Sequence, residues 1–186
     1  EHSNVEWLFR QFGDYGVGTT AFLEGRYSDA LEAMKRVVAS PLASPGDWNV
    51  LAQCYGKLNR WDEAVDAYTR SVEGQINARS ADGVVVNLLE ALVCANRPAQ
   101  TLEFTESIRK KGWKLPPDDT DEGRQNRAIY HAYRAMALIM LGKDAAEDVA
   151  AIRRLTTRSD FKITTWGWDE FDRWFATTTL KPEART

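Results

Sequence analysis

The fold is decided by the segment DYGVGTTAFLEGRYSDALEAMKRVV at Asp14–Val38, which superimposes without a gap on WNVLAQCYGKLNRWDEAVDAYTRSV at Trp48–Val72. The two copies are offset by 34 residues. Apolar and small residues recur in them at three- and four-residue spacing, a pattern typical of amphipathic helices. Each copy therefore predicts a helix, a tight turn and a second helix.

Small residues occupy equivalent positions in the two copies. Gly18 aligns with Ala52, and a small side chain there lets the partner helix approach closely. Ala30 aligns with Ala64, at a crossing where a larger side chain would overpack. One helix pair cannot bury both of its faces, so we expect neighbouring pairs to stack on one another.

The turn inside each copy is repeated as well. Gly25 aligns with Asn59, and both residue types are typical of the position that ends a helix. Tyr27 aligns with Trp61, so we expect an aromatic ring to wedge each turn.

The second copy carries a repeat motif at Trp48, Leu51, Ala52, Tyr55, Ala64 and Tyr68. This spacing resembles the tetratricopeptide repeat (TPR), whose units recur every 34 residues. The first copy keeps Gly18, Ala30 and Met34 but has Asp14 in place of the tryptophan. The resemblance implies an all-α, right-handed α-α superhelix, a TPR-like solenoid of about four helix pairs with a C-terminal capping helix.

Later units are more degenerate. The third has Thr101 and Thr105 where alanine and an aromatic residue are expected, and the fourth has Glu147, or Ala146 after a one-residue slip, at the packing position. The resemblance implies one domain over 1–186, divided into repeat 1 at about 12–42, repeat 2 at 46–76, repeat 3 at 82–111, a loop at 112–126, repeat 4 at 127–157 and a cap at 166–178.

A second apolar region is the C-terminal aromatic segment, Trp166–Phe175. Trp168, Phe171 and Phe175 share one helical face in it. A solenoid exposes its last face and needs a cap, which is the simplest interpretation. The alternative is that the segment lies in the concave groove or mimics a partner helix.

Composition excludes several function classes. The chain has 186 residues with a formal net charge of -3, which argues against a strongly basic nucleic-acid binder. The most apolar stretch, Gly83–Ala95, is too short and too polar to cross a bilayer. Cys54 and Cys94 are too few for a disulfide framework. We expect them to be buried thiols in a cytoplasmic protein, whose oligomeric state stays open.

No catalytic motif stands out, and we expect no cofactor, no metal and no enzyme activity. His131 lies in a helical run and is expected to be a structural residue. The acidic residues Asp118, Asp119, Asp121 and Glu122 lack the spacing of a calcium loop. An enzyme that uses His131 and the loop Lys110–Asn126 is the least favoured hypothesis.

The resemblance implies a protein- or peptide-binding surface on the first helix of each pair. Its residues are Tyr15, Thr19, Phe22, Asn49, Gln53, Lys57, Val86 and Glu90. One subset of the family clamps a terminal carboxylate with lysines and asparagines, but here Tyr15, Thr19 and Val50 stand at those positions. The leading hypothesis is a non-catalytic adaptor or scaffold, and the alternative is a regulatory domain that controls an attached or partner enzyme.

Overall fold

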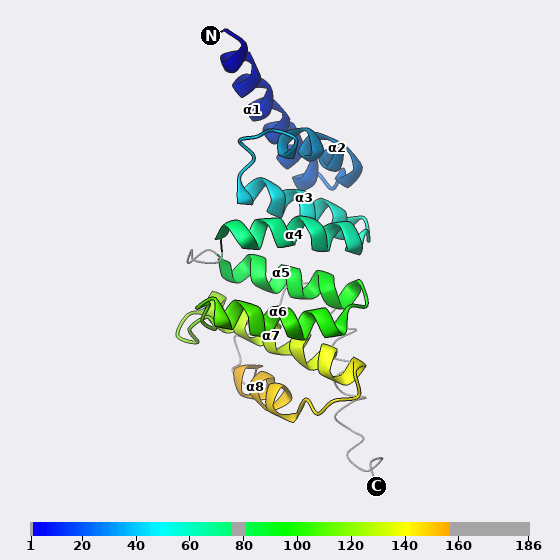
Figure 1. Cartoon of the computed structure of the whole chain (residues 1–186), viewed down its shortest axis with the longest axis vertical. Helices are drawn as coiled ribbons and strands as arrows, with labels where there is room; N and C mark the ends of the chain where they lie inside the picture. The colour runs from blue at the N-terminus through cyan, green and yellow to red at the C-terminus, as the bar shows by residue number, and fades with distance from the viewer. Residues whose placement is uncertain (1, 76–80, 157–186) are drawn as a thin grey trace.

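The computed structural model describes residues 2–75 and 81–156, with side chains at 12–75 and 81–155. Helices and no strands occupy this part of the chain: α1 His2–Leu23, α2 Tyr27–Val38, α3 Pro45–Lys57, α4 Trp61–Gln75, α5 Ala81–Cys94, α6 Pro98–Lys110, α7 Asp121–Met140 and α8 Ala146–Thr156. The helices stack along the long axis, from α1 at one end to α8 at the other (Figure 1). The predicted all-α repeat fold is confirmed, whereas the proposed cap at 166–178 lies outside the described residues.

The turn inside each helix pair has the same backbone conformation. The left-handed residues are Gly25 (φ 75°), Asn59 (φ 56°), Asn96 (φ 57°) and Gly142 (φ 66°). In every case the next amide donates to the carbonyl five residues earlier, at 2.8 to 2.9 Å, which is the pattern of a left-handed helix cap. The predicted helix-ending role of Gly25 and Asn59 is confirmed and extends to the last two pairs.

Small residues set the close approach of α1 to α2. A Cβ atom added at Gly18 would lie 2.8 Å from Sδ of Met34, and Ala30 is fully buried. In the second pair Ala52 and Ala64 are also fully buried. The packing positions predicted from the two copies are therefore confirmed.

The turn aromatics pack against the end of the preceding helix. Tyr27 meets Phe22 edge-on, with ring centroids 5.4 Å apart. Trp61 covers Gly56, where an added Cβ would lie 3.2 Å from the indole ring. Phe22 and Gly56 are equivalent positions, so a large residue faces the smaller tyrosine ring and glycine faces the larger tryptophan.

The third unit replaces two apolar packing residues with threonines and still buries them. Thr101 is fully buried and Thr105 is 2% exposed. Their hydroxyls donate to the carbonyls of Arg97 at 3.0 Å and Leu102 at 2.7 Å on the same helix. Because the helix itself satisfies both hydroxyls, the substitutions leave no unpaired polar group in the core.

The loop between α6 and α7 is anchored by packing. The indole of Trp113 is buried, donates to Asp82 at 3.0 Å and lies 5.4 Å from the ring of Tyr130. Thr120 accepts a hydrogen bond from the amide of Gly123 at 3.0 Å and caps α7. These contacts give the loop a structural role in joining the third and fourth units.

The fourth unit corrects one expectation. Ala146 and Glu147 are both exposed, and the buried residue in the first turn of α8 is Asp148, at 1% exposure. The reason is a longer turn, since α8 begins four residues after Gly142 whereas α2 begins two residues after its turn glycine. Helix α8 therefore starts later relative to the turn, and the buried Asp148 lies one residue beyond the position that alanine occupies in the first two units.

Candidate functional site

The turn residues define which side chains of α1, α3, α5 and α7 occupy equivalent places. Residues at the same distance before the left-handed residue lie at the same position on their helices, because the turns share one conformation. Three such rows make up what we call the odd-helix face: Tyr15, Asn49, Val86 and Ala132; Thr19, Gln53, Glu90 and Met136; Phe22, Gly56, Val93 and Ile139.

The first unit gives this face an aromatic end. Tyr15 is 39% exposed and Phe12, one turn earlier, is 71% exposed. The hydroxyl of Thr19 donates to the carbonyl of Tyr15 at 2.9 Å, whereas Phe22 is half-buried against Tyr27. Tyr15 and Phe12 therefore offer aromatic surface, and Phe22 serves mainly to hold the turn.

The second unit makes the face polar. Asn49 and Gln53 are half-buried, and Lys57 is exposed at the end of α3. The side-chain oxygen of Asn49 is buried and has no hydrogen-bond partner among the described residues. A buried amide oxygen without a partner is uncommon, which distinguishes Asn49 from the other predicted site residues.

The third unit contributes a carboxylate. Burial raises the pKa of the Glu90 carboxyl. The hydroxyl of Tyr133 donates a hydrogen bond to this carboxyl, and the positive charge of Lys57 acts on it as well. Both effects lower the pKa, but they offset only part of the rise. Burial and the nearby carboxylate also raise the pKa of Tyr133. The hydrogen bond between Tyr133 and Glu90 thus joins α7 to α5, and the charge of Lys57 on α3 acts on the same carboxyl. Val86, in contrast, is 4% exposed and offers almost no surface to a partner.

The fourth unit makes the opposite end apolar. Met136 and Ile139 are half-buried on α7. Met140, the last residue of the helix, is 43% exposed and Leu141 is 38% exposed. The odd-helix face therefore changes along the array from aromatic to polar, then to a carboxylate and finally to apolar side chains.

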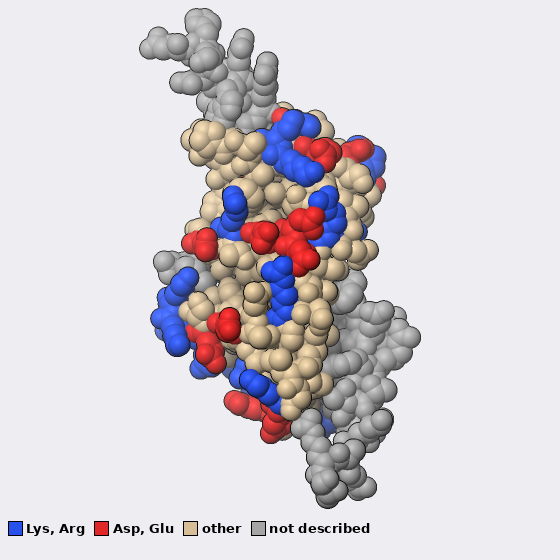
Figure 2. All heavy atoms as spheres, turned by 45° about the vertical axis from the view of Figure 1, so that its right-hand side comes forward, with Lys and Arg blue, Asp and Glu red and all other residues tan. Residues whose placement is uncertain are grey.

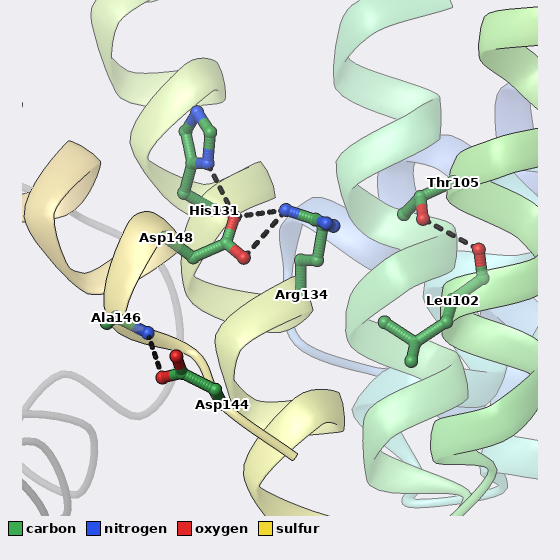
Figure 3. Close-up of polar contacts among 7 residues, drawn as sticks. All are labelled: Leu102, Thr105, His131, Arg134, Asp144, Ala146 and Asp148. Atoms are coloured by element: carbon green, nitrogen blue, oxygen red, sulfur yellow. Dashed lines mark hydrogen bonds and ion pairs between the residues drawn. The ribbon is translucent and has the colours of Figure 1, made fainter.

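A polar cluster lies between α7 and α8 (Figure 3). Arg134 donates to both oxygens of the Asp148 carboxylate, at 2.9 and 2.7 Å, and Nδ1 of His131 lies 2.8 Å from one of them. Asp148 is nearly inaccessible to solvent, so the two side chains from α7 replace its hydration. The cluster fastens the last two described helices together.

Sequence reasoning placed His131 in the helix packing and missed both of its partners. The signal that could have revealed them is a carboxylate in the apolar stretch of α8, at Asp148. A buried carboxylate needs a cation or several donors. Arg134 lies one turn after the histidine, on the same side of α7.

Two other chemical expectations concern thiols and metals. Cys54 is fully buried, and burial raises the pKa of its thiol to about 11, whereas Cys94 is only half-buried. Within 2–75 and 81–156 no group of three or more His, Cys, Asp or Glu residues is placed to hold a metal ion. No helix in this part of the chain has the length and apolar character needed to cross a bilayer.

The side of the array that carries the turns is highly charged. A basic residue follows each left-handed residue: Arg26 pairs with Asp29 at 2.7 Å, Arg60 with Glu63 at 2.5 Å, and Arg97 reaches across to Asp62 at 2.5 Å. Figure 2, which turns the right-hand side of Figure 1 forward, shows acidic and basic side chains intermixed there. Exposed pairs of this kind contribute little to stability, and their mixed signs favour no single charged partner.

Comparisons with known proteins agree with this geometry. A family model described as anaphase-promoting complex, cyclosome, subunit 3 matches residues 15–71, from the second half of α1 to the last turn of α4. The sequence matches no curated protein.

Among solved structures, the chain is similar to a Podosopora anserina protein assigned as a kinesin light chain with nearly identical TPR-like repeats. The TM-score is 0.61 at 16% identity, over 82% of this chain and 77% of that one. A variant of the same protein gives 0.60 at 17% identity, over 78% and 74%. At such low identity the likeness establishes the fold, a TPR-like helical solenoid.

Proposed function

We propose that this chain, which folds as a TPR-like helical solenoid, is a non-catalytic protein-interaction module. It acts as an adaptor or scaffold and binds a peptide or partner protein on the odd-helix face. TPR-like folds commonly bind other proteins, and the family matching residues 15–71 is named for a subunit of a multiprotein complex. Both points favour a macromolecular partner over a small molecule.

The observation that carries the proposal is the repeated placement of accessible side chains on successive odd helices. Tyr15 supplies an aromatic anchor, Gln53 supplies an amide that can pair with a peptide backbone, and Lys57 supplies a charge at the edge. Aromatic side chains that bury area at low entropic cost are typical of binding hot spots.

The proposal is tested by selecting ligands for the full chain from a displayed library of random peptides and titrating the best binder. Tyr15→Ala and Gln53→Ala should each weaken binding by about tenfold or more, which corresponds to about 1.4 kcal/mol. Val17→Ala is the matched control, because Val17 is 56% exposed on the other side of α1 and should leave the affinity unchanged. Equal affinity of all three variants would remove the odd-helix face as the binding surface.

A further inference from the structure

Large exposed apolar side chains are unevenly distributed over the described residues. Most of them lie in the first unit and the connection after it: Phe12, Tyr15, Val17, Leu23 and Leu42. The remaining two, Met140 and Leu141, lie together where α7 ends. The C-terminal half of the described chain therefore has one place at which large apolar side chains meet solvent.

We call this place the α7 apolar patch and define it as Met136, Ile139, Met140 and Leu141. The first three are spaced by three and four residues and so share one side of α7. Met136 and Ile139 also belong to the odd-helix face, so the patch is the C-terminal end of that face. Methionine adapts to irregular surfaces and makes favourable contacts with aromatic rings.

The last described helix offers no comparable surface. The exposed side chains of α8 are small or charged: Ala146, Glu147, Ala150, Arg153 and Arg154. A segment that covered only the outer side of α8 would bury little large apolar surface, and the hydrophobic gain scales with the apolar area buried. Of the two surfaces, the outer side of α8 and the α7 apolar patch, the patch therefore has the more to gain from being covered.

The chain beyond α8 supplies a matching occupant. The C-terminal aromatic segment carries Trp168, Phe171 and Phe175 at three- and four-residue spacing, which would place the three rings on one face of a helix. Its linker, residues 157–165, reaches about 30 Å when extended. Helix α8 has 11 residues and is about 16 Å long, so the linker is long enough to return to the end of α7.

We propose that the C-terminal aromatic segment docks within the same chain on the α7 apolar patch. Trp168, Phe171 and Phe175 contact Met136, Ile139 and Met140, and the segment covers the C-terminal end of the odd-helix face. Because the linker is short, the local concentration of the segment is on the order of millimolar, so a weak contact is enough to keep it bound. If the proposed function holds, a partner that uses this end of the face has to displace the segment.

Hydrogen exchange of the full-length chain, read by mass spectrometry, tests the docking without any partner. In the unmodified protein, amides in residues 166–175 and at the end of α7 should exchange slowly. Met140→Lys should speed exchange in 166–175 by about tenfold or more, and Phe171→Asp should do the same at the end of α7. Lysine suits a helix C-terminus, so the first variant should keep its melting temperature.

The matched control is Leu42→Lys, an exposed apolar residue at the far end of the array, which should leave exchange in both regions unchanged. Fast exchange of 166–175 in the unmodified chain would overturn the docking, as would slow exchange that Met140→Lys does not change. Protection that disappears on dilution would also overturn it, because the contact would then be between two copies.

The effect on partner binding is measured separately with the peptide selected above. Phe171→Asp should raise its affinity by several-fold, because the competing segment is released. Unchanged affinity together with the reciprocal exchange effects would overturn the regulatory consequence and leave the docking in place. If no peptide binds the face at all, the proposed function fails, while the exchange result still decides the docking.

Discussion

Gly123 fixes the path of the loop that enters α7. A Cβ atom at this position would overlap the carbonyl oxygen of Pro117 and lie 2.8 Å from the capping hydroxyl of Thr120. A backbone atom cannot move aside as the end of a flexible side chain can. Glycine is therefore required by the close approach of the loop and the helix.

The Gly123→Ala variant should lower the free energy of unfolding by about 1–3 kcal/mol, the usual cost of overpacking. Gly83 is the matched control, since it is also the third residue of its helix and has nothing within 4 Å of its added Cβ. Gly83→Ala should raise stability by up to about 1 kcal/mol through helix propensity. Urea denaturation measures both, and equal effects would show that the overlap is relieved elsewhere.

Glu90 makes stability depend on pH. Its carboxyl has a raised pKa in the folded chain, chiefly because it is buried. The folded state then holds the proton more tightly than the unfolded chain, so the free energy of unfolding falls as pH rises from the ordinary glutamate pKa through the raised value. Below the ordinary value the carboxyl is protonated in both states and this contribution is fully present.

Glu90→Gln should remove this loss, because glutamine keeps an acceptor for Tyr133 and does not ionise. The variant should melt at a higher temperature than the unmodified chain at neutral pH, and the difference should shrink as the pH is lowered. Glu103→Gln, at an exposed position on α6, is the control. A pH-independent difference between the Glu90 variant and the unmodified chain would contradict the assignment.

At the scale of helices, the Asp148 cluster is the main polar link between α7 and α8. Removing one member of a buried charge pair leaves the other uncompensated and typically costs 3–5 kcal/mol. Because Arg134 is 28% exposed, water can replace part of the lost contact, and we expect Asp148→Ala to cost about 2–3 kcal/mol.

The neighbouring variant Glu147→Ala removes an exposed carboxylate and should change stability by less than about 0.5 kcal/mol. Chemical denaturation of the two variants gives the comparison. A small effect of Asp148→Ala would mean that apolar packing alone holds α8 on α7.

At this scale, the sequence predicts contacts within one helix pair better than contacts between different pairs. Gly18, Ala30 and Gly25 act within one helix pair, and the second copy repeats the pattern, so their roles could be read from alignment. The pairing of Asp148 with His131 follows a longer turn before α8, which no other repeat copy shares. The same reason hid the contact of Glu90 with Tyr133, since it joins two different units.

At the scale of the molecule, the side-chain chemistry of the odd-helix face changes step by step along α1, α3, α5 and α7. Its aromatic end lies on α1, its polar centre on α3 and α5, and its apolar end on α7. The sequence did not predict that Val86 is buried or that the side-chain oxygen of Asn49 has no hydrogen-bond partner among the described residues. Those properties arise from the packing of α5 against its neighbours and from side-chain rotamers.

The most direct test of the account is to locate a bound ligand. The peptide selected on the full chain is synthesised with a photoreactive benzophenone residue, crosslinked by irradiation, and the adducts are mapped by mass spectrometry. The account predicts adducts on α1, α3, α5 and α7, within residues 12–23, 49–57, 86–94 and 132–141, and loss of these adducts when unlabelled peptide competes. Competed adducts confined to α2, α4 or α6 would contradict it.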